Sequence, residues 1–507
     1  MIAARILAAG LLVALIAPPP VYADPVADRQ ILHLLNRIAF GPTAEDVAHV
    51  NTIGIDRYIE EQLHPEAIPE PAVLSERLAP LETQRLGAAR LFAEYGPPPS
   101  ETRGGAKPTQ EAIDARIARG DAILQQARVA RVWRALYSRR QLQEAMVDFW
   151  FNHFNVYAYN GFDALWVGNY ENEAIRPHVL GQFRDLLLAT AHHPAMLFYL
   201  DNQVSTAPGS PNARGLFGGI NENYAREIME LHTLGADGGY TQKDVSTLAL
   251  ILSGWGFDYR NLAAGSGPAF VFDPSRHDSS DEVFLGHRIP AGGEEQGIAA
   301  IDILAHSPAT AHHIAFELAQ YFVADNPPPA LVDRLAEEFL TSDGDIKTVM
   351  KALLTSPEFR DSAGQKYKTP YQYVLSAVRA AGAAPKSPTP LLGTMAQLGM
   401  PLYLCPTPDG YKNTEDAWLS PDAANVRTNF AVLVGSGALL NYVPPSEAHL
   451  VVVSTAPGPA KPVAVETGAL EALLNPILAD HTRAAIAGSP AALQAALILG
   501  SPDFMRR

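Results

Sequence analysis

The chain has 507 residues, of which 47% are hydrophobic and 18% charged, a composition that is ordinary for a folded globular protein. Its 54 acidic and 38 basic residues give a formal net charge of −16, and without a basic stripe nucleic acid is excluded as an expected partner. The single cysteine, Cys405, excludes an internal disulfide, and we expect its thiol to be a small buried side chain.

The first 23 residues have the layout of a signal peptide. Arg5 precedes an apolar run from Ile6 to Ala17, which is followed by three prolines and by Val21-Tyr22-Ala23. A membrane-spanning helix needs about twenty apolar residues, so this shorter run makes a retained anchor the weaker alternative. The sequence predicts cleavage after Ala23 and an exported, soluble protein, periplasmic or extracellular, with no membrane span.

Apolar residues recur at helical spacing from Gln30 to Leu63, with a break at residues 40–42. Thr43 and Asp46 follow that break at the spacing of a capping box. The pattern predicts an N-terminal helical hairpin region over residues 24–95.

Residues 109–443 are predicted to form the main helical domain, and residues 444–507 a linker with the last helices. Amphipathic helices are expected at 129–137, 142–150, 221–234, 241–252, 297–360 and 370–383. The fold class is therefore mainly α, a multi-helix globular bundle. Leu354–Arg360 is echoed by Leu499–Arg506, which we interpret as a reused turn at a helix exit rather than a true repeat.

One part of the main domain departs from helical periodicity. Phe270-Val271-Phe272 and Val283-Phe284-Leu285 are short strand-like runs separated by polar residues. They predict a small β-hairpin insertion near residues 268–288.

A polar stripe on the predicted helix 221–234 supplies the candidate catalytic residues. The stripe consists of Asn223, Arg226, Glu227 and Glu230. Paired carboxylates suit acid–base chemistry, because burial can raise the pKa of one while a neighbouring cation keeps the other ionised. The alternative is a solvated face with weak Arg–Glu pairs.

The aromatic segment Phe149–Tyr157 is the second candidate. His153 continues its apolar stripe, which is typical of a core histidine. Asp148, Asn152 and Asn155, however, fall at i, i+4 and i+7 and form a polar stripe able to orient a ligand or a carboxylate. Aromatic rings beside amides and acids also hold sugars, although core packing gives the same composition.

The third candidate is the His277-Asp278 pair, which lies between the two strand-like runs, where binding groups or ordinary turn residues are equally expected. If His153, His232 and His277 converged with a glutamate, they would form a site for a divalent or transition metal. Their spacing does not require it, and the usual metal motifs are absent from the sequence.

The absence of several sequence motifs argues against further classes of protein. The sequence has no G-x-S-x-G elbow, no P-loop and no glycine-rich dinucleotide fingerprint, which argues against serine hydrolases, nucleotide-driven proteins and NAD-dependent enzymes. His192-His193 and His312-His313 are interpreted as a helix end and a helix surface, both structural.

Several motifs together resemble one family. They are Leu34–Thr43, Phe149–Phe154, Asn223–Gly235, His277-Asp278 and Ser356–Arg360. Their order and spacing resemble the DUF1800 family over about residues 30–443. The resemblance implies an exported, largely helical protein and a DUF1501-type partner protein, and it implies no particular reaction. Many such sequences carry basic residues after the position of His312-His313, whereas this chain has Phe316, Glu317 and Gln320, so an anionic contact of that helix is not expected here.

The leading hypothesis is a polysaccharide-active hydrolase or lyase with Glu227 and Glu230 as acid and base, or with Asp148 or Asp278 as the partner acid. The expected lining of the substrate site is Asn152, His153, Arg226, His232, Trp255, His277 and Asp278. Two alternatives stay open. One is a metal-dependent extracytoplasmic enzyme with a His/Glu site, and the other is a non-catalytic export or surface-assembly scaffold that works with a partner protein.

Overall fold

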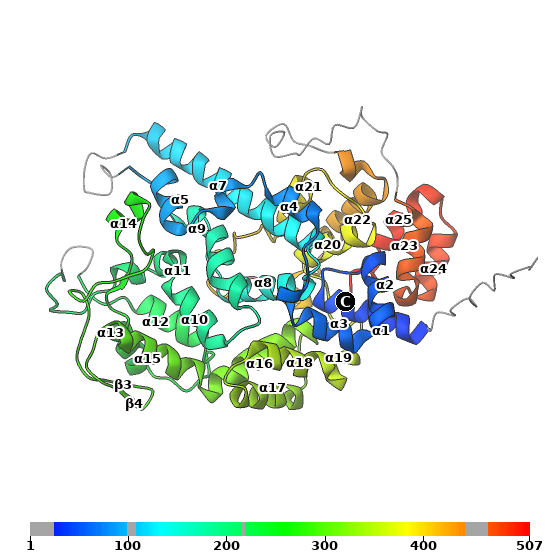
Figure 1. Cartoon of the computed structure of the whole chain (residues 1–507). Helices are drawn as coiled ribbons and strands as arrows, with labels where there is room; N and C mark the ends of the chain where they lie inside the picture. The colour runs from blue at the N-terminus through cyan, green and yellow to red at the C-terminus, as the bar shows by residue number, and fades with distance from the viewer. Residues whose placement is uncertain (1–24, 99–107, 214–217, 442–464) are drawn as a thin grey trace, which may run out of the picture.

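The structure, a computed structural model, describes residues 25–98, 108–213, 218–441 and 465–507. Helices dominate these residues, and only two small antiparallel strand pairs accompany them, which confirms the mainly α prediction (Figure 1). No helix in this part of the chain has the length and apolar character needed to cross a membrane. The predicted signal peptide, residues 1–23, and most of the predicted linker lie outside the described residues.

The α-helices follow the chain in a regular series. The first are α1 Pro25–Ile38, α2 Ala44–Ile53, α3 Ile55–Gln62, α4 Ala72–Leu78, α5 Ala88–Tyr95, α7 Gln110–Tyr137, α8 Gln141–His153, α9 Asp163–Tyr170, α10 Phe183–His192, α11 Pro194–Tyr199, α12 Glu222–Glu230, α13 Gln242–Ile251 and α14 Tyr259–Ala264. The others are α15 Glu294–Ala305, α16 Pro308–Phe322, α17 Pro329–Thr341, α18 Ile346–Thr355, α19 Pro357–Arg360, α20 Pro370–Ala380, α21 Thr389–Gln397, α22 Pro421–Gly435, α23 Thr467–Leu474, α24 Asp480–Ala487 and α25 Ala491–Leu499.

Capping residues explain where several of these helices begin. The Thr43 side chain accepts a hydrogen bond from the backbone N–H of Asp46, whose carboxylate accepts in return from the Thr43 N–H, so the predicted capping box is confirmed. Gly54, at φ 86°, then ends α2 and starts α3. The predicted N-terminal hairpin is therefore interrupted, and three helices replace two.

The four strands form two separate pairs. They are β1 Trp255–Gly256 with β2 Val271–Phe272, and β3 Glu282–Phe284 with β4 His287–Ile289. The prediction that residues 270–272 pair with residues 283–285 is wrong. Leu285 and Gly286 both have positive φ, 49° and 81°, and this tight turn folds β3 back onto the residues that immediately follow it.

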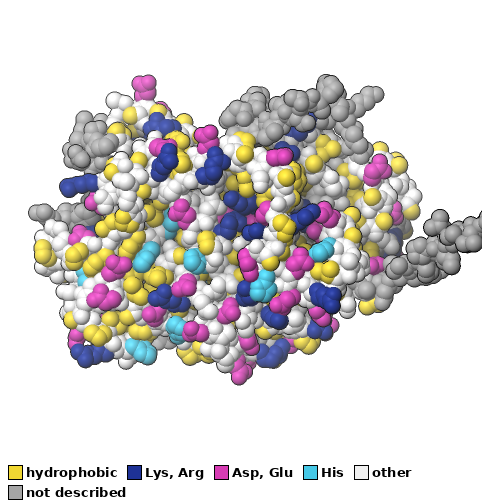
Figure 2. Space-filling view, viewed as in Figure 1, with side chains coloured by type: hydrophobic (Ala, Val, Ile, Leu, Met, Phe, Trp, Pro, Cys, Tyr) yellow, Lys and Arg dark blue, Asp and Glu magenta, His cyan; other side chains and the backbone are white. Residues whose placement is uncertain are grey.

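Figure 1 shows an elongated molecule with α16 to α19 along one long edge, the β3–β4 hairpin at one end and α23 to α25 at the other. The last residues return to the centre, where the backbone of Lys366 exchanges two hydrogen bonds with that of Arg507. Acidic and basic side chains alternate over the face drawn in Figure 2, without a basic stripe on it.

The two echoed segments form the same turn. Ser356 Oγ accepts from the N–H of Phe359 at 3.1 Å, and Ser501 Oγ accepts from the N–H of Phe504 at 3.1 Å. Each hydroxyl also donates to the carbonyl three residues earlier, at 2.8 Å. The likeness between the segments therefore corresponds to one local hydrogen-bond pattern at two helix exits.

Two helical glycines give a matched test of core packing. A Cβ added at Gly297 would lie 2.1 Å from Cζ2 of Trp255, whose side chain is completely buried, whereas one added at Gly393 would meet no atom within 4 Å. We expect Gly297→Ala to lower the free energy of unfolding by about 1–3 kcal/mol. Gly393→Ala should raise it by about 0.5–1 kcal/mol, because alanine is the better helix former. Urea denaturation of both variants measures this difference, and equal effects would contradict the packing described.

Candidate functional site

A small polar pocket lies where α8, α16, the end of α12 and the segment after α21 meet. Its volume is about 160 Å³. The side chains that line it include acids, histidines, amides and aromatic rings, namely Asp148, Phe149, Asn152, His153, Leu231, His313, Glu317, Gln320, Tyr321, Asp409, Tyr411, Lys412 and Asn413. A cavity of about 150 Å³ accommodates benzene, so the pocket has room for a group of that size, which is smaller than a complete sugar ring with its hydroxyl groups.

The His153–Glu317 pair forms the inner part of this pocket. His153 Nδ1 lies 2.6 Å from Glu317 Oε2, and Nε2 lies 3.2 Å from the carbonyl oxygen of His232. Both ring nitrogens thus face oxygen atoms. Burial tends to raise the pKa of Glu317, but the charges of His153 and His313 and the His153 hydrogen bond lower it below its ordinary value. Glu317 is therefore held as a carboxylate.

The early end of α12 brings backbone carbonyls to the pocket. The helix ends at Glu230, and the backbone N–H of His232 then bonds the carbonyl of Glu227 at 3.1 Å. The next carbonyls, those of Leu231 and His232, face the rings of His313 and His153, each at 3.2 Å. The predicted helix 221–234 thus stops four residues early, and the ring of His232 itself is buried beneath the site.

Gly235 makes the close approach of α12 to α16 possible. It has φ 82°, which favours glycine, and a Cβ at this position would lie 3.1 Å from Nδ1 of His313. A larger residue here would push α16 away from the end of α12.

Two amides of α8 and the loop beyond it fix the opposite wall. Asn152 Nδ2 donates to the carbonyl of Tyr411 at 2.8 Å and its Oδ1 accepts from the Tyr411 N–H at 2.7 Å. Asn155 donates to the carbonyls of Cys405 and Thr407. This predicted substrate-binding residue therefore lines the pocket, and its amide holds the backbone of Tyr411 in the loop.

Asp148 connects the pocket to a buried ionic network. Its carboxylate accepts from Tyr321 Oη at 2.9 Å and from Arg131 at 2.7 Å, and Arg131 also lies 3.2 Å from Glu171. Glu171 in turn pairs with Arg176 at 2.9 Å. Burial raises the pKa of Asp148 above its ordinary value against the opposing charge of Arg131. This network holds α7, α8 and α16 together behind the pocket.

Glu227 and Glu230, the two predicted catalytic acids, have different surroundings. Glu227 is half-buried one helical turn before Leu231, and burial, together with the charges of Glu230 and Asp409, raises its pKa. Glu227 does not itself line the pocket, but Asp409, whose charge acts on it, and Leu231, one turn later in the chain, both do. Glu230 instead accepts a hydrogen bond from Tyr240 at 3.1 Å, on the side of α13.

Four of the other predicted residues do not line this pocket. Arg226 is partly exposed and donates to Gln242 at 2.9 Å. Trp255 is completely buried in the core against Gly297, so it cannot present its ring to a substrate as expected. Asp278 accepts from the N–H and the hydroxyl of Ser280, which is the turn alternative.

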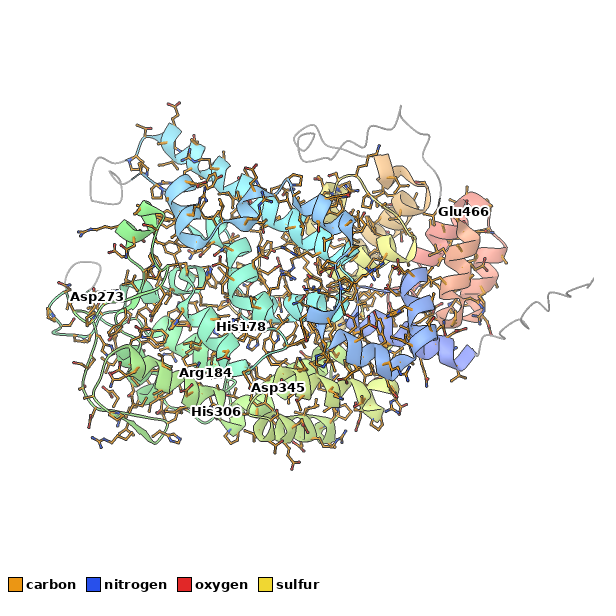
Figure 3. The ribbon with its side chains drawn as sticks, viewed as in Figure 1. His178, Arg184, Asp273, His306, Asp345 and Glu466 are labelled. Carbon is orange, nitrogen blue, oxygen red and sulfur yellow. The ribbon has the colours of Figure 1, made fainter. Side chains whose placement is uncertain are left out.

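The fourth residue, His277, joins the β-strand region to α15. Its two ring nitrogens lie 2.9 Å from the carbonyl of Ser253 and 2.8 Å from Gln296 Oε1, and its side chain is buried. Figure 3 shows the nearby Asp273 at one end of the molecule, away from α8. His277 thus lies apart from the other two predicted metal ligands, His153 and His232, whose ring centroids are 5.9 Å apart. Within the described residues, no group of three or more His, Cys, Asp or Glu side chains is arranged to hold a metal ion.

The largest omission of the sequence analysis is the inner face of α16. The prediction that His313 is only a surface residue is wrong, because it lines the pocket and contacts Glu317 at 3.6 Å. The sequence contains a pattern that could have identified this face of α16. His313, Glu317, Gln320 and Tyr321 are spaced at i, i+4, i+7 and i+8 and form one polar stripe. Lys412 and Asp409, which pair at 2.8 Å, belong to an irregular segment without comparable periodicity.

Comparisons with known proteins assign the chain to a family and indicate no activity. The model of a protein family described as "Protein of unknown function (DUF1800)" matches residues 33–506. The match extends beyond the expected limit at residue 443 and includes α23 to α25. No curated protein and no solved structure matches the chain.

Proposed function

Since the chain belongs to the DUF1800 family, whose description names no reaction, we propose from the site alone that it is an exported glycan-active enzyme that cleaves glycosidic bonds by acid–base catalysis. Export is inferred from the signal-peptide layout of residues 1–23. The observation that carries the proposal is that two glutamates have pKa values shifted in opposite directions. They are Glu317, which lines the pocket, and Glu227, whose pKa is raised in part by the pocket residue Asp409. Such divergence is how two carboxyl groups acquire separate acid and base roles.

The surroundings of each glutamate support a role. Glu227 has its pKa raised by burial and by neighbouring acids, which favours its protonated form more than that of an ordinary glutamate, as a general acid requires. Glu317 stays ionised, and its bond to His153 fixes the direction of its carboxylate. The pair proposed here is therefore Glu227 with Glu317, in place of Glu227 with Glu230.

The composition of the pocket supports a sugar as the bound group. Amides and acids from Gln320, Asn413 and Asp409 line the same space as the rings of Phe149 and Tyr411. Sugar rings combine hydroxyl groups, which need donors and acceptors, with C–H faces that pack on aromatic rings. The volume of about 160 Å³ accommodates part of such a ring, with the rest of the sugar and of the chain outside the pocket.

The cleavage step follows from these roles. Glu317 accepts a proton from a water molecule as the water oxygen bonds to the anomeric carbon. The bond from that carbon to the leaving oxygen breaks, and Glu227 gives its proton to that oxygen. Water is consumed, a hemiacetal and an alcohol are formed, and the two glutamates exchange protonation states, which solvent restores.

The experiment is a panel of neutral, acidic and amino polysaccharides, incubated with the mature chain purified after export. We expect new reducing ends from at least one polymer, formed without a new carbon–carbon double bond, and their loss in Glu317→Gln. Products that absorb in the near ultraviolet through such a double bond would replace hydrolysis with a lyase reaction. Equal products from Glu317→Gln and wild type, or none from any polymer, would overturn the proposal.

A further inference from the structure

A second cavity lies between α1, α24 and the turn at residues 363–364. Its volume is about 530 Å³. No residue lines both this cavity and the pocket that contains His153 and Glu317. The two are connected through Tyr321, which lines that pocket and whose backbone carbonyl accepts a hydrogen bond from Arg507 at 2.7 Å. Four arginines, Arg29, Arg483, Arg506 and Arg507, line it together with two acids, Asp480 and Asp503, so the cations outnumber the carboxylates. In a chain of net charge −16, this is a local reversal of charge.

Not all of this positive charge is neutralised. Arg483 pairs with Asp480 at 2.7 Å, and Arg506 pairs with Glu415. Arg507, whose side chain is almost completely buried, has no carboxylate within ion-pair distance among the described residues, and its Nε has no hydrogen-bond partner there. The neighbouring Arg37 likewise has no carboxylate within ion-pair distance among the described residues, and its Nε has no hydrogen-bond partner there. Burial and the charge of Arg507 lower the pKa of Arg37. A bound oxyanion would neutralise the unpaired charge of these guanidinium groups.

Two side chains that line the cavity each have a hydrogen-bond acceptor atom without a donor among the described residues. His33 and Asn36 are buried and line it. His33 Nε2 lies 2.7 Å from the carbonyl of Phe359 and donates to it, which leaves Nδ1 as an acceptor. Neither this Nδ1 nor Asn36 Oδ1 has a donor among the described residues. A ligand for this cavity therefore needs acceptor oxygens for arginine and also a hydroxyl to donate.

We propose that this cavity binds a hydrogen phosphate group, either free or as the monoanion of a phosphate monoester. Hydrogen phosphate carries both acceptor oxygens and a hydroxyl, whereas sulfate and carboxylate carry acceptors alone. Arg507 contacts the anion from the inside, and Arg29 contacts it from the rim. Arg29 is exposed, and among the described residues its side chain donates only to the carbonyl of Pro476. The proposal is independent of the glycan activity.

The test is thermal unfolding of the full chain, with inorganic phosphate titrated at constant ionic strength. We expect a saturable rise in Tm with phosphate and an apparent affinity at least about tenfold weaker for sulfate. Glycerol 3-phosphate binding more tightly than inorganic phosphate would assign a monoester, and the reverse would assign free phosphate.

Variants of the arginines complete the test. Arg507→Met should abolish the rise in Tm, and Arg29→Gln should weaken phosphate binding several-fold without changing the Tm of the free protein. Arg57→Gln, an exposed arginine of α3, is the matched control and should bind as wild type does. If Arg507→Met does not fold, Arg29→Gln alone decides. Equal responses to phosphate and sulfate, or equal binding by Arg29→Gln and Arg57→Gln, would overturn the proposal.

Discussion

Replacing Arg131 with methionine is expected to lower the free energy of unfolding by about 3–5 kcal/mol, since it removes one partner from a buried ionic network. Arg131 is 5% exposed, and its partners Asp148 and Glu171 are 6% and 2% exposed. The substitution leaves two carboxylates in the core without their shared cation. Because a domain of ordinary stability has about 5–15 kcal/mol in total, the loss should be visible as a large shift of the urea midpoint.

A surface ion pair supplies the control. Arg139 lies 2.8 Å from Glu45, but their side chains are 55% and 76% exposed. Arg139→Met is therefore expected to cost less than about 1 kcal/mol. Similar losses for the two substitutions would mean that Arg131 is not the centre of a desolvated network.

The second large effect is expected on catalysis. Glu317→Gln should lower kcat/KM by about 10²–10⁴-fold, because the amide cannot accept a proton from water. The folded structure should persist, since glutamine can still accept the His153 hydrogen bond through its carbonyl oxygen. Steady-state kinetics on the polymer found in the panel measures the loss, and circular dichroism verifies the fold.

Glu230→Gln is the matched control, with the same chemical change three residues beyond Glu227. Its carboxylate bonds Tyr240, so we expect a change in kcat/KM of less than about tenfold. A larger loss for Glu230→Gln than for Glu317→Gln would restore the pair predicted from the sequence and remove Glu317 from the reaction.

Local rules of sequence predicted much of the fold. Capping residues such as Thr43 and Thr241 start helices where expected, and both form capping boxes. Sequence patterns could not predict the exact end of α12 or the pairing of the strands. They depend on single turns, the π-like bond from His232 to Glu227 and the positive φ of Leu285, which sequence periodicity does not encode.

The site was predictable only in part, because its residues come together from distant segments. His153 and Glu227 were identified from stripes on their own helices, but Glu317 lies 164 positions after His153. Nothing in one helix reveals which face of another will pack against it. Asn152 lines the pocket, but the sequence did not indicate its bond to Tyr411, which lies 259 positions away. Trp255 is instead buried in the core, and the two ring nitrogens of His277 are engaged by Ser253 and Gln296, away from this pocket.

The pH dependence of kcat/KM tests the central claim most directly. Glu317 must be ionised and has a lowered pKa, whereas Glu227 must be protonated and has a raised pKa, so activity should fall as pH drops below the first value and as pH rises above the second. Glu227→Gln, assayed on an aryl glycoside whose leaving group needs no proton, should keep the low-pH limb and lose the high-pH limb. A high-pH limb that is unchanged in Glu227→Gln would contradict the assignment of Glu227 as the acid and of this pocket as the acid–base site.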